Sequence, residues 1–419
     1  MTKQSMADKK PVVFRVLRGI SWLSFGYFVL LLGASLANAQ TKPRGRDLGI
    51  PFPGTPGPHN AITDVAGVAV GHATIMRGSG RLVPHQGPVR TGVTAILTRP
   101  RGDWAPVFAA TFNGNGNGDM TGTNWIAESG FLEGPILLTG THSVGTVRDA
   151  VIQWELKNGR QFQFTYPVVA ETFDFLSDAN GEHVKQEHAF AALDSARPGK
   201  VTEGAVGGGT GMGCNGWKGG IGTSSRKLGS GAGDWTVGVL VQCNYGGSLQ
   251  VLGVPIVRPA ELGICRTADS ATQEWVSRLR RCASGSRQGQ GDESPPRGSI
   301  VVIVATDAPL LPHQLARLAR RVPMALGHLG SWASNFSGDL FLAFSTANHN
   351  ASQSDTATIA TWPNESMDPL FRAVIEATEE SVVNAMLAAE TMEGADGVRV
   401  SGLPGSLVVD ALKKAGRMQ

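Results

Sequence analysis

The chain has 419 residues, of which 41% are hydrophobic and 17% charged, and its formal net charge at pH 7 is +3. Length alone fits one large domain or two or three smaller ones. The 55 glycines follow no period and are interleaved with runs of Val, Ile and Leu. This pattern excludes a collagen-like or disordered chain and indicates many tight turns between strands.

The first 39 residues have the pattern of a signal peptide. Basic residues precede an apolar run at 20–32, and the tripeptide Ala-Asn-Ala at 37–39 is a small-x-small sequence of the kind that signal peptidase cleaves. We expect cleavage before Gln40 and a periplasmic or secreted protein. The alternative is a retained membrane anchor, because the stretch 20–39 is about as long as the roughly 20 residues that span a bilayer.

The basic charge belongs to this leader. It contains five basic residues and one acidic residue, so the chain without it has a formal net charge of −1. The charge therefore gives no indication of a nucleic-acid partner.

The cysteines form no C-x-x-C pair, which argues against a zinc site. In an oxidising periplasm Cys265 and Cys282 could form a disulfide, but buried free thiols are an equal alternative. No metal or organic cofactor is indicated. The four cysteines are Cys214, Cys243, Cys265 and Cys282.

In chain order, the Pro- and Gly-rich segment 40–60 predicts an irregular arm laid over the surface. Alternating apolar residues between 61 and 113 then predict strands of an antiparallel or mixed sheet. The glycine-rich stretch 114–130 leads into an expected helix at 123–129. Its glycines fit either a close approach of the backbone to another group or a plain turn.

A helix is expected within 141–159, where apolar residues recur at helical spacing. His142, near its start, favours a structural role, because no partner motif accompanies it. The strand that follows ends at Glu171. A carboxylate at a strand end can be the counter-charge for a bound amine, although a surface glutamate is the commoner case.

The most glycine-dense stretch is 204–225, and it contains no G-x-x-x-x-G-K-[ST] motif and no clear βαβ frame. Close backbone packing around a pocket explains its glycines more simply than a nucleotide does. A buried strand is expected at 235–244. The amide of Asn244 at its end could face an oxyanion, or the residue could merely turn the chain.

The composition of 266–297 is polar and predicts a mobile connection, with a short helix possible at 272–282. It ends at Gly298-Ser299, before a strand buried on both faces, Ile300–Ala305. Cleavage between Gly298 and Ser299 would give Ser299 both a hydroxyl and an α-amine. An α-amine titrates at about 7.7–8.0, so it can act as the base that activates the hydroxyl. Taken alone, however, Gly-Ser is a common dipeptide where a loop meets a strand.

The remainder of the chain predicts a helix within 309–327, a buried strand within 334–346, a long amphipathic helix at 367–392 and a short helix at 405–415. Helices packed on buried strands imply a layered α/β or α+β core.

Several long blocks, found in one order over nearly the whole chain after the leader, resemble one family. It is the family of L-aminopeptidase/D-amino-acid esterase-amidases and β-peptidyl aminopeptidases, which are self-processing N-terminal serine hydrolases. The blocks are RDLGIPFPGTPGPHNAITDVAGVAVGH, GNGNGDMTGT, THSVGTVRDAV, PVVAET, GGGTGMGC, GGIGTSSR, VGVLVQCNYG, GSIVVIVATDAPLLPHQ and SGDLFLAFSTAN.

The resemblance implies an α+β fold, a four-layer αββα sandwich with mixed sheets. It also implies cleavage into an α chain of about 40–298 and a β chain of 299–419, and a ring of four αβ units. Ser299 would be the nucleophile and Asn244 part of the oxyanion hole. The remaining matches are Ser337 and Asp339, the hydroxyl and acidic residue beside the nucleophile, and Glu171, which would hold the free amine of the substrate.

The sequence departs from the family at Phe173, where relatives carry a tyrosine whose hydroxyl assists near the oxyanion. Tyr166 and Tyr245 are near in sequence but do not match that position. Loss of one such donor can reduce turnover by about 10²–10³. The stretch 266–297 also resembles an insertion before the cleavage point.

These residues predict a self-cleaving aminopeptidase that acts on peptides, amides or esters through a Ser299 acyl-enzyme, without a cofactor. An ordinary Ser-His-Asp hydrolase is disfavoured, because G-x-S-x-G is absent. A periplasmic amine-binding protein that has lost the chemistry is the other alternative, and Phe173 mildly favours it. The sequence leaves open whether the substrates are α-peptides, D-amino-acid derivatives or β-peptides.

Overall fold

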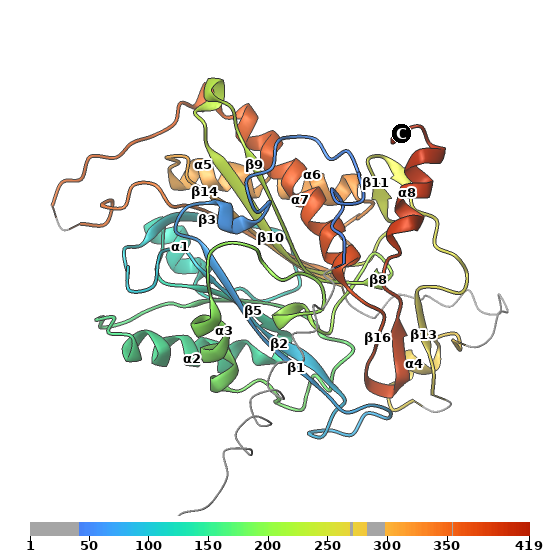
Figure 1. Ribbon diagram of the computed structural model, residues 1–419. Helices are drawn as coiled ribbons and strands as arrows, with labels where there is room; N and C mark the ends of the chain where they lie inside the picture. Colours follow the sequence, from blue (N-terminus) through green and yellow to red (C-terminus); the bar gives the residue numbers. More distant parts are fainter. Residues whose placement is uncertain (1–41, 269–270, 283–297, 354) are drawn as a thin grey trace, which may run out of the picture. The chain divides into compact units, whose positions relative to one another are not determined.

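The computed structural model describes residues 42–268, 271–282, 298–353 and 355–419 (Figure 1). The predicted signal peptide and most of the segment that precedes Gly298 lie outside the described residues.

The larger sheet has six strands in the order β4-β3-β15-β14-β10-β9. β14 and β15 run parallel, and the other neighbours are antiparallel. The sheet is therefore mixed, with β14 next to its centre. In that order the strands are Phe131–Leu132, Val107–Gly116, Gly338–Ser345, Ser299–Thr306, Thr236–Asn244 and Gly220–Lys227.

The smaller sheet has four strands in the order β1-β2-β5-β6, and only β5 and β6 are parallel. Helices α2 and α3 pack on this sheet, whereas α5 and α7 pack on the larger one, with α6 against α7. The strands are Ala69–Arg77, Val89–Leu97, Ile136–Gly140 and Val168–Thr172. The helices are Val144–Lys157 (α2), Gln186–Ser195 (α3), Pro312–Ala319 (α5), Val322–His328 (α6) and Asp368–Ala388 (α7).

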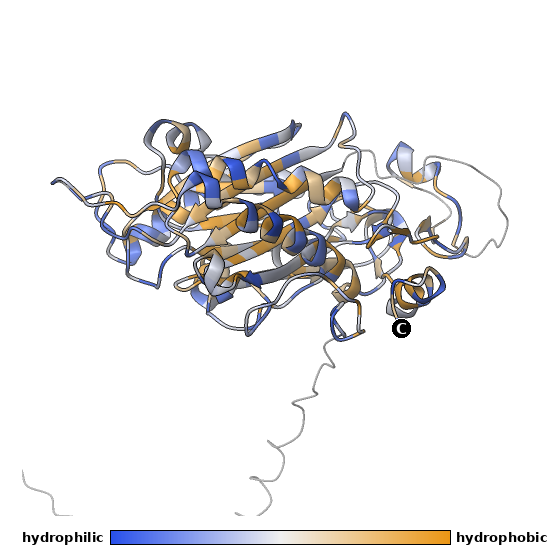
Figure 2. Cartoon of the chain, turned by 90° about the horizontal axis from the view of Figure 1, so that it is seen from above, coloured by the Kyte–Doolittle hydropathy of each residue, from blue (hydrophilic) through white to orange (hydrophobic). Residues whose placement is uncertain are grey.

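Three apolar layers hold these elements together. One lies between the larger sheet and its helices, one between the two sheets, and one between the smaller sheet and its helices. Figure 2 shows the apolar strands inside and the polar residues concentrated on the outer helices and loops. The four-layer αββα arrangement predicted for this chain is confirmed.

Strand β14 illustrates why the sequence forms this core. All eight of its residues are buried, and side chains alternate between layers: Ile300 and Val302 contact the helices, while Val301 and Ile303 lie between the sheets. A continuous β-branched run is typical of a strand covered on both faces.

The segment 309–327, predicted as one helix, forms two. α5 ends at Ala319 and α6 begins at Val322. Pro323 has no N–H to donate to the carbonyl of Ala319, so a continuous helix would lose a hydrogen bond there. The helices α1 (Thr123–Ser129) and α8 (Gly405–Lys414) are found where the sequence places them.

A small three-stranded sheet, β13-β17-β16, and two short hairpins, β7-β8 and β11-β12, complete the described strands. Residues 271–282, predicted to belong to a mobile connection, contain α4, and a disulfide joins Cys265 to Cys282. A second disulfide, Cys214–Cys243, was not predicted. The bounds are Ile264–Arg266 (β13), Val398–Val400 (β17), Met392–Glu393 (β16), Gly213–Cys214 (β7), Trp217–Lys218 (β8), Gln250–Val251 (β11), Val254–Pro255 (β12) and Glu274–Ser277 (α4).

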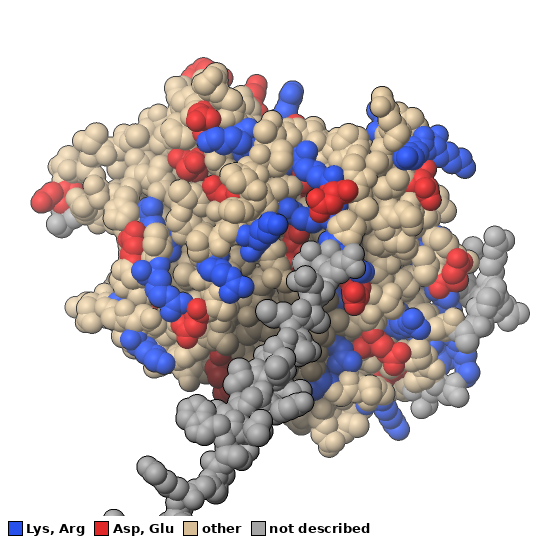
Figure 3. Space-filling model, viewed as in Figure 1, with Lys and Arg blue, Asp and Glu red and all other residues tan. Residues whose placement is uncertain are grey.

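On the face shown in Figure 3, Lys and Arg residues are interspersed with Asp and Glu. Among the described residues, no helix has both the length and the apolarity needed to cross a membrane.

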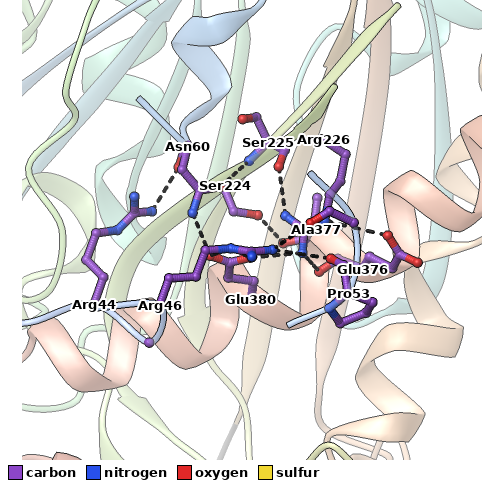
Figure 4. Close-up of polar contacts among 12 residues, drawn as sticks. Arg44, Arg46, Pro53, Asn60, Ser224, Ser225, Arg226, Glu376, Ala377 and Glu380 are labelled. Atoms are coloured by element: carbon purple, nitrogen blue, oxygen red, sulfur yellow. Dashed lines mark hydrogen bonds and ion pairs between the residues drawn. The ribbon is translucent and has the colours of Figure 1, made fainter. Parts of the chain in front are cut away.

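The arm predicted at 40–60 is described from residue 42 and is held by ion pairs. Arg44 pairs with Glu203 at 2.7 Å. Arg46 pairs with Glu380 of α7 at 3.0 Å (Figure 4). Arg226 of β9 also pairs with Glu380, at 2.9 Å. These ion pairs fasten the arm to Glu203 and to α7, and they fasten α7 to the outer strand of the larger sheet.

Candidate active site

Three central strands of the larger sheet bring Ser299, Asn244 and Gly338 side by side. Ser299 begins β14 and lies opposite Asn244, the last residue of β10, while Gly338 begins β15 beside it. Ser299 is 3% exposed and Asn244 is 1% exposed. Because side chains alternate along a strand, Ser299 points to the same side as Val301, between the two sheets.

The peptide bond before Ser299 is closely surrounded by backbone. The N–H of Gly338 donates to the carbonyl oxygen of Gly298 over 3.2 Å. A Cβ at position 298 would lie 3.1 Å from the Cα of Tyr245 and 3.2 Å from the nitrogen of Gly246. Glycine therefore fits this position, and a donor already contacts the carbonyl that a nucleophile would attack.

The carboxamide of Asn244 has a fixed orientation. Its Oδ1 accepts a hydrogen bond from the N–H of Gly213 at 2.9 Å, and its Nδ2 donates to the carbonyl of Phe173 at 2.9 Å. An amide nitrogen has two N–H groups. The second can donate to a ligand at the end of the strand.

Ser337 and Asp339 form a buried pair. The Ser337 hydroxyl donates to Oδ1 of Asp339 over 2.6 Å, and the two residues are 3% and 2% exposed. In the parallel register, Asp339 lies beside Ile300, so the tripeptide 337–339 runs alongside the Gly298–Ser299 bond. Burial raises the pKa of Asp339, and the hydrogen bond from Ser337 opposes that rise.

Glu171, in the last part of β6, is 4% exposed and accepts two hydrogen bonds. The hydroxyl of Thr141 donates to one carboxylate oxygen, and the N–H of Asp119 donates to the other at 3.1 Å. Burial raises the pKa of Glu171, and the charges of Asp119 and Asp174 add to the effect. Among its described contacts no cation compensates this carboxylate, which makes it suited to bind one.

A cavity of about 390 Å³ joins several of these residues. Gly298, Ser299, Glu171 and Phe173 all line it, and His142 stands at its wall. Asn244, Ser337 and Asp339 are not lining residues, but they lie directly behind Ser299 on the neighbouring strands. The predicted site residues therefore gather at one end of the larger sheet.

Neither tyrosine near in sequence supplies a hydroxyl to the described cavity wall. Tyr245 is buried and accepts a hydrogen bond from Asn215 at 3.2 Å, and burial raises the pKa of its hydroxyl. Tyr166 is 43% exposed and packs against Trp125. Phe173 thus presents a hydrocarbon ring to the cavity.

Sequence reasoning missed the groups that hold the predicted residues in place. Thr141 and Asp119 fix Glu171, while the backbone N–H groups of Gly213 and Gly338 contact Asn244 and Gly298. The available signal was the density of glycine in the blocks around 114–118 and 204–220. No group of three or more His, Cys, Asp or Glu in the described ranges is arranged to hold a metal ion.

The four-layer fold, with a serine at the start of a central strand, defines an N-terminal-nucleophile type of hydrolase. A solved structure with this fold is the L-aminopeptidase D-Ala-esterase/amidase of Ochrobactrum anthropi, described as a variant of the Ntn hydrolase fold. It is 39% identical, covers 90% of this chain and 100% of its own, and has a TM-score of 0.77.

The model of peptidase family S58 matches residues 60–400, and the chain belongs to this family. It is 45% identical over 395 residues to the β-peptidyl aminopeptidase BapA of Sphingosinicella microcystinivorans, with coverage of 93% of this chain and 96% of the relative. A Burkholderia sp. β-aminopeptidase structure is 43% identical, with a TM-score of 0.75 and coverage of 89% and 99%.

The chain is therefore an enzyme, an N-terminal serine aminopeptidase, as predicted. The alternatives, an amine-binding protein without chemistry and an ordinary serine hydrolase, are not favoured by these relatives.

Proposed function

We propose that the chain cleaves itself between Gly298 and Ser299, and that Ser299 then removes N-terminal β-amino acids from short peptides. The observation that carries the proposal is the position of Ser299 at the start of β14, opposite Asn244 and lining the cavity with Glu171. The β-peptide preference rests on the relatives, because those named for β-peptides are 43–45% identical and the L-aminopeptidase is 39% identical.

In self-cleavage, the Ser299 hydroxyl attacks the carbonyl carbon of Gly298, and the N–H of Gly338 stabilises the negative charge on the oxygen. The C–N bond then breaks, and the hydroxyl proton passes to the released nitrogen. This leaves an ester between the two residues and a free α-amine. Water hydrolyses the ester, which frees the Gly298 carboxylate and regenerates the Ser299 hydroxyl.

In turnover, the α-amine of Ser299 takes the proton of its own hydroxyl, and the oxygen attacks the substrate carbonyl. The Nδ2 of Asn244 and the N–H of Gly338, released by the departure of Gly298, stabilise the oxyanion. The α-ammonium gives its proton to the leaving amine. Water, with the α-amine again acting as base, hydrolyses the acyl ester.

Ser337 and Asp339 orient the α-amine in this scheme. The hydroxyl of Ser337 donates a hydrogen bond to Asp339, so its oxygen lone pairs remain to accept a hydrogen bond from the N–H of Ser299. The buried carboxylate of Asp339 favours the ammonium form that appears after proton transfer.

Glu171 holds the ammonium group of the substrate, and this explains a requirement for a free N-terminus. Its two hydrogen bonds fix the carboxylate at the cavity wall without compensating its charge. The cavity of about 390 Å³ accommodates a residue with an extra backbone carbon and a side chain.

We further propose that residues 1–39 are a cleaved signal peptide, that the enzyme works in the periplasm or is secreted, and that four αβ units associate. Two disulfides are typical of an oxidising compartment, which supports the location. The α chain should begin at Gln40, and light scattering should give the mass of four αβ units.

The decisive experiment is the intact mass of the denatured protein, with N-terminal sequencing of each species. Wild type should give two chains, one beginning Ser-Ile-Val-Val, whereas Ser299→Ala should remain one chain without activity. Ser345→Ala, at the other end of β15, is the matched control and should still be cleaved. An active but uncleaved wild-type chain would contradict the mechanism.

Substrate class is tested with the p-nitroanilides of β-alanine, L-alanine and D-alanine and their N-acetyl forms. We expect the largest kcat/KM for β-alanine and none for the acetylated compounds. A larger kcat/KM for L- or D-alanine would contradict the β-peptide preference and leave the self-cleavage proposal standing.

A further inference from the structure

A fully buried lysine lies behind Asn244. Lys218, in β8, is 0% exposed, and its ammonium donates to the carbonyls of Met212 at 2.7 Å and Gly219 at 2.9 Å. Within the described ranges no carboxylate pairs with it, and burial lowers its pKa to about 7. Because an unpaired buried ammonium is costly, its retention in the core needs a physical reason.

The hydrogen bond from Lys218 to Met212 holds the peptide unit between Met212 and Gly213. The carbonyl of Met212 and the N–H of Gly213 belong to the same planar trans peptide, so they point in opposite directions. Lys218 Nζ and the N–H of Gly219, at 3.0 Å, fix the oxygen of that unit. Its N–H donates to Oδ1 of Asn244 at 2.9 Å. Lys218 therefore sets the direction of the hydrogen bond that orients the Asn244 carboxamide.

The β7-β8 hairpin is attached on both sides of Asn244. The disulfide Cys214–Cys243 joins the hairpin to the residue before Asn244. The N–H of Asn215 donates to the carbonyl of Tyr245, the residue after it, at 2.7 Å. Any tilt of the 212–213 peptide is therefore transmitted to the carboxamide rather than absorbed by a loose loop.

We propose that Lys218 is a positioning residue for the oxyanion hole, which acts on the reaction only through the Gly213 N–H and Asn244. Besides fixing geometry, the charged form of Lys218 strengthens the peptide N–H as a donor by acting on its carbonyl, and a chain of hydrogen bonds passes this polarisation on. The inference rests on the role proposed above for Asn244.

The test is a double-mutant cycle of Lys218→Met and Asn244→Ala, with kcat and KM for β-alanyl p-nitroanilide measured per mole of chain that begins at Ser299. Removal of an oxyanion donor lowers kcat by about 10²–10³. Misorientation of the same donor should lower kcat about 10-fold or more in Lys218→Met, with KM little changed. In the Asn244→Ala background, Lys218→Met should cause no further loss.

Lys227→Met is the matched control, since Lys227 is a half-exposed lysine at the far end of β9, paired with Asp234 at 3.5 Å. It should leave kcat unchanged. An equal loss of kcat from Lys218→Met in both backgrounds would show a general structural role and overturn the proposal, as would an unchanged kcat in the single variant.

Two further measurements keep the test decisive. If a variant cleaves itself slowly, it is incubated until intact mass shows enough chain that begins at Ser299, and kcat is then measured on that chain. If Lys218→Met does not fold, Lys218→Gln, which keeps a neutral donor, replaces it. If the wild-type protein cleaves itself and turns over substrate, but Lys218 and Asn244 are not coupled, only this inference is contradicted. If the wild-type protein neither cleaves itself nor turns over substrate, the proposed function is contradicted.

Discussion

Buried charged side chains lie near both ends of strands β9 and β10. At one end they form ion pairs, and at the other they have no partner of opposite charge among their described contacts. Far from Ser299, Arg226 is 1% exposed and its partner Glu380 is 0% exposed. Near the nucleophile, Lys218 has only carbonyl partners among its described contacts, while Glu171 and Asp339 are buried without a cation. At the first end, which we call the neutralised end, the fold itself supplies the opposite charges. At the second, which we call the incomplete end, the described residues supply none.

The neutralised end is a structural fastening. Figure 4 shows Arg46 of the arm and Arg226 of β9 converging on Glu380 of α7, while Arg44 is directed at Asn60. Every charge there has a partner of opposite sign within the fold, as expected of groups that only hold elements together.

The incomplete end agrees with the proposed chemistry. In the proposed function, the carboxylate of Glu171 would bind the ammonium group of a substrate, and that of Asp339 would face the α-amine that self-cleavage would create. Buried carboxylates with raised pKa values and no cation are costly in the empty precursor, and binding or processing supplies the missing charge. The contrast teaches that unpaired buried charge, more than buried charge as such, marks the functional region.

The largest predicted effect is on stability. Glu380→Gln removes the carboxylate that Arg46 and Arg226 share and should destabilise the fold by about 3–5 kcal/mol, because the buried Arg226 then keeps only its longer ion pair with Glu376, at 3.6 Å. Denaturant unfolding measures the loss, and kcat per folded molecule should not change. Glu379→Gln is the control, since its partner His328 is exposed, and it should change stability by less than about 1 kcal/mol.

The next effect is pH dependence at the same end. Burial raises the pKa of Glu203 from 4.5 to about 7, despite its ion pair with Arg44. A raised folded-state pKa contributes stability that is full below pH 4.5 and is lost as pH rises through 7. Between these values, the unfolding free energy of wild type should fall relative to Glu203→Gln, by about 3 kcal/mol at most. Parallel curves for the two proteins would contradict this assignment.

At the incomplete end, Glu171→Gln should act on catalysis instead. Losing a charged hydrogen bond to the substrate ammonium, worth about 1.5–3 kcal/mol, should lower kcat/KM for free-amine substrates about 10–100-fold. Because the native carboxylate is desolvated without a cation, stability should be unchanged or slightly increased. Thr165→Val, remote from the cavity, is a control for substitution of a buried polar group. An unaltered preference for free amines over N-acetyl substrates would refute the role of Glu171.

Sequence patterns predicted the parts of this molecule that depend on local chemistry. Continuous β-branched runs located β10 and β14, and helical spacing located α2 and α7, although α7 ends at Ala388, before the predicted residue 392. The order of layers and the roles of the site residues came from the family resemblance.

The sequence could not predict contacts between residues that are distant along the chain, or hydrogen bonds that are donated by backbone N–H groups. Arg46 and Glu380 are 334 residues apart, and no local pattern pairs them. The disulfide Cys214–Cys243 likewise depends on the fold that brings β7 to β10. The donors at Gly213 and Gly338 are peptide N–H groups, which every residue type except proline has, so no side chain identifies them.

The smallest predicted effect concerns Phe173, which lines the cavity and accepts a hydrogen bond from Asn244 through its carbonyl. Phe173→Tyr adds a hydroxyl near the oxyanion without removing that bond. Because the proposed oxyanion hole already has two donors, from Asn244 and Gly338, a third should raise kcat by less than about 10-fold. Phe175→Tyr, on the same cavity wall, is the matched control and should not raise kcat. A fall in kcat for Phe173→Tyr would mean that the cavity has adapted to the ring, with the two described donors sufficient for this enzyme.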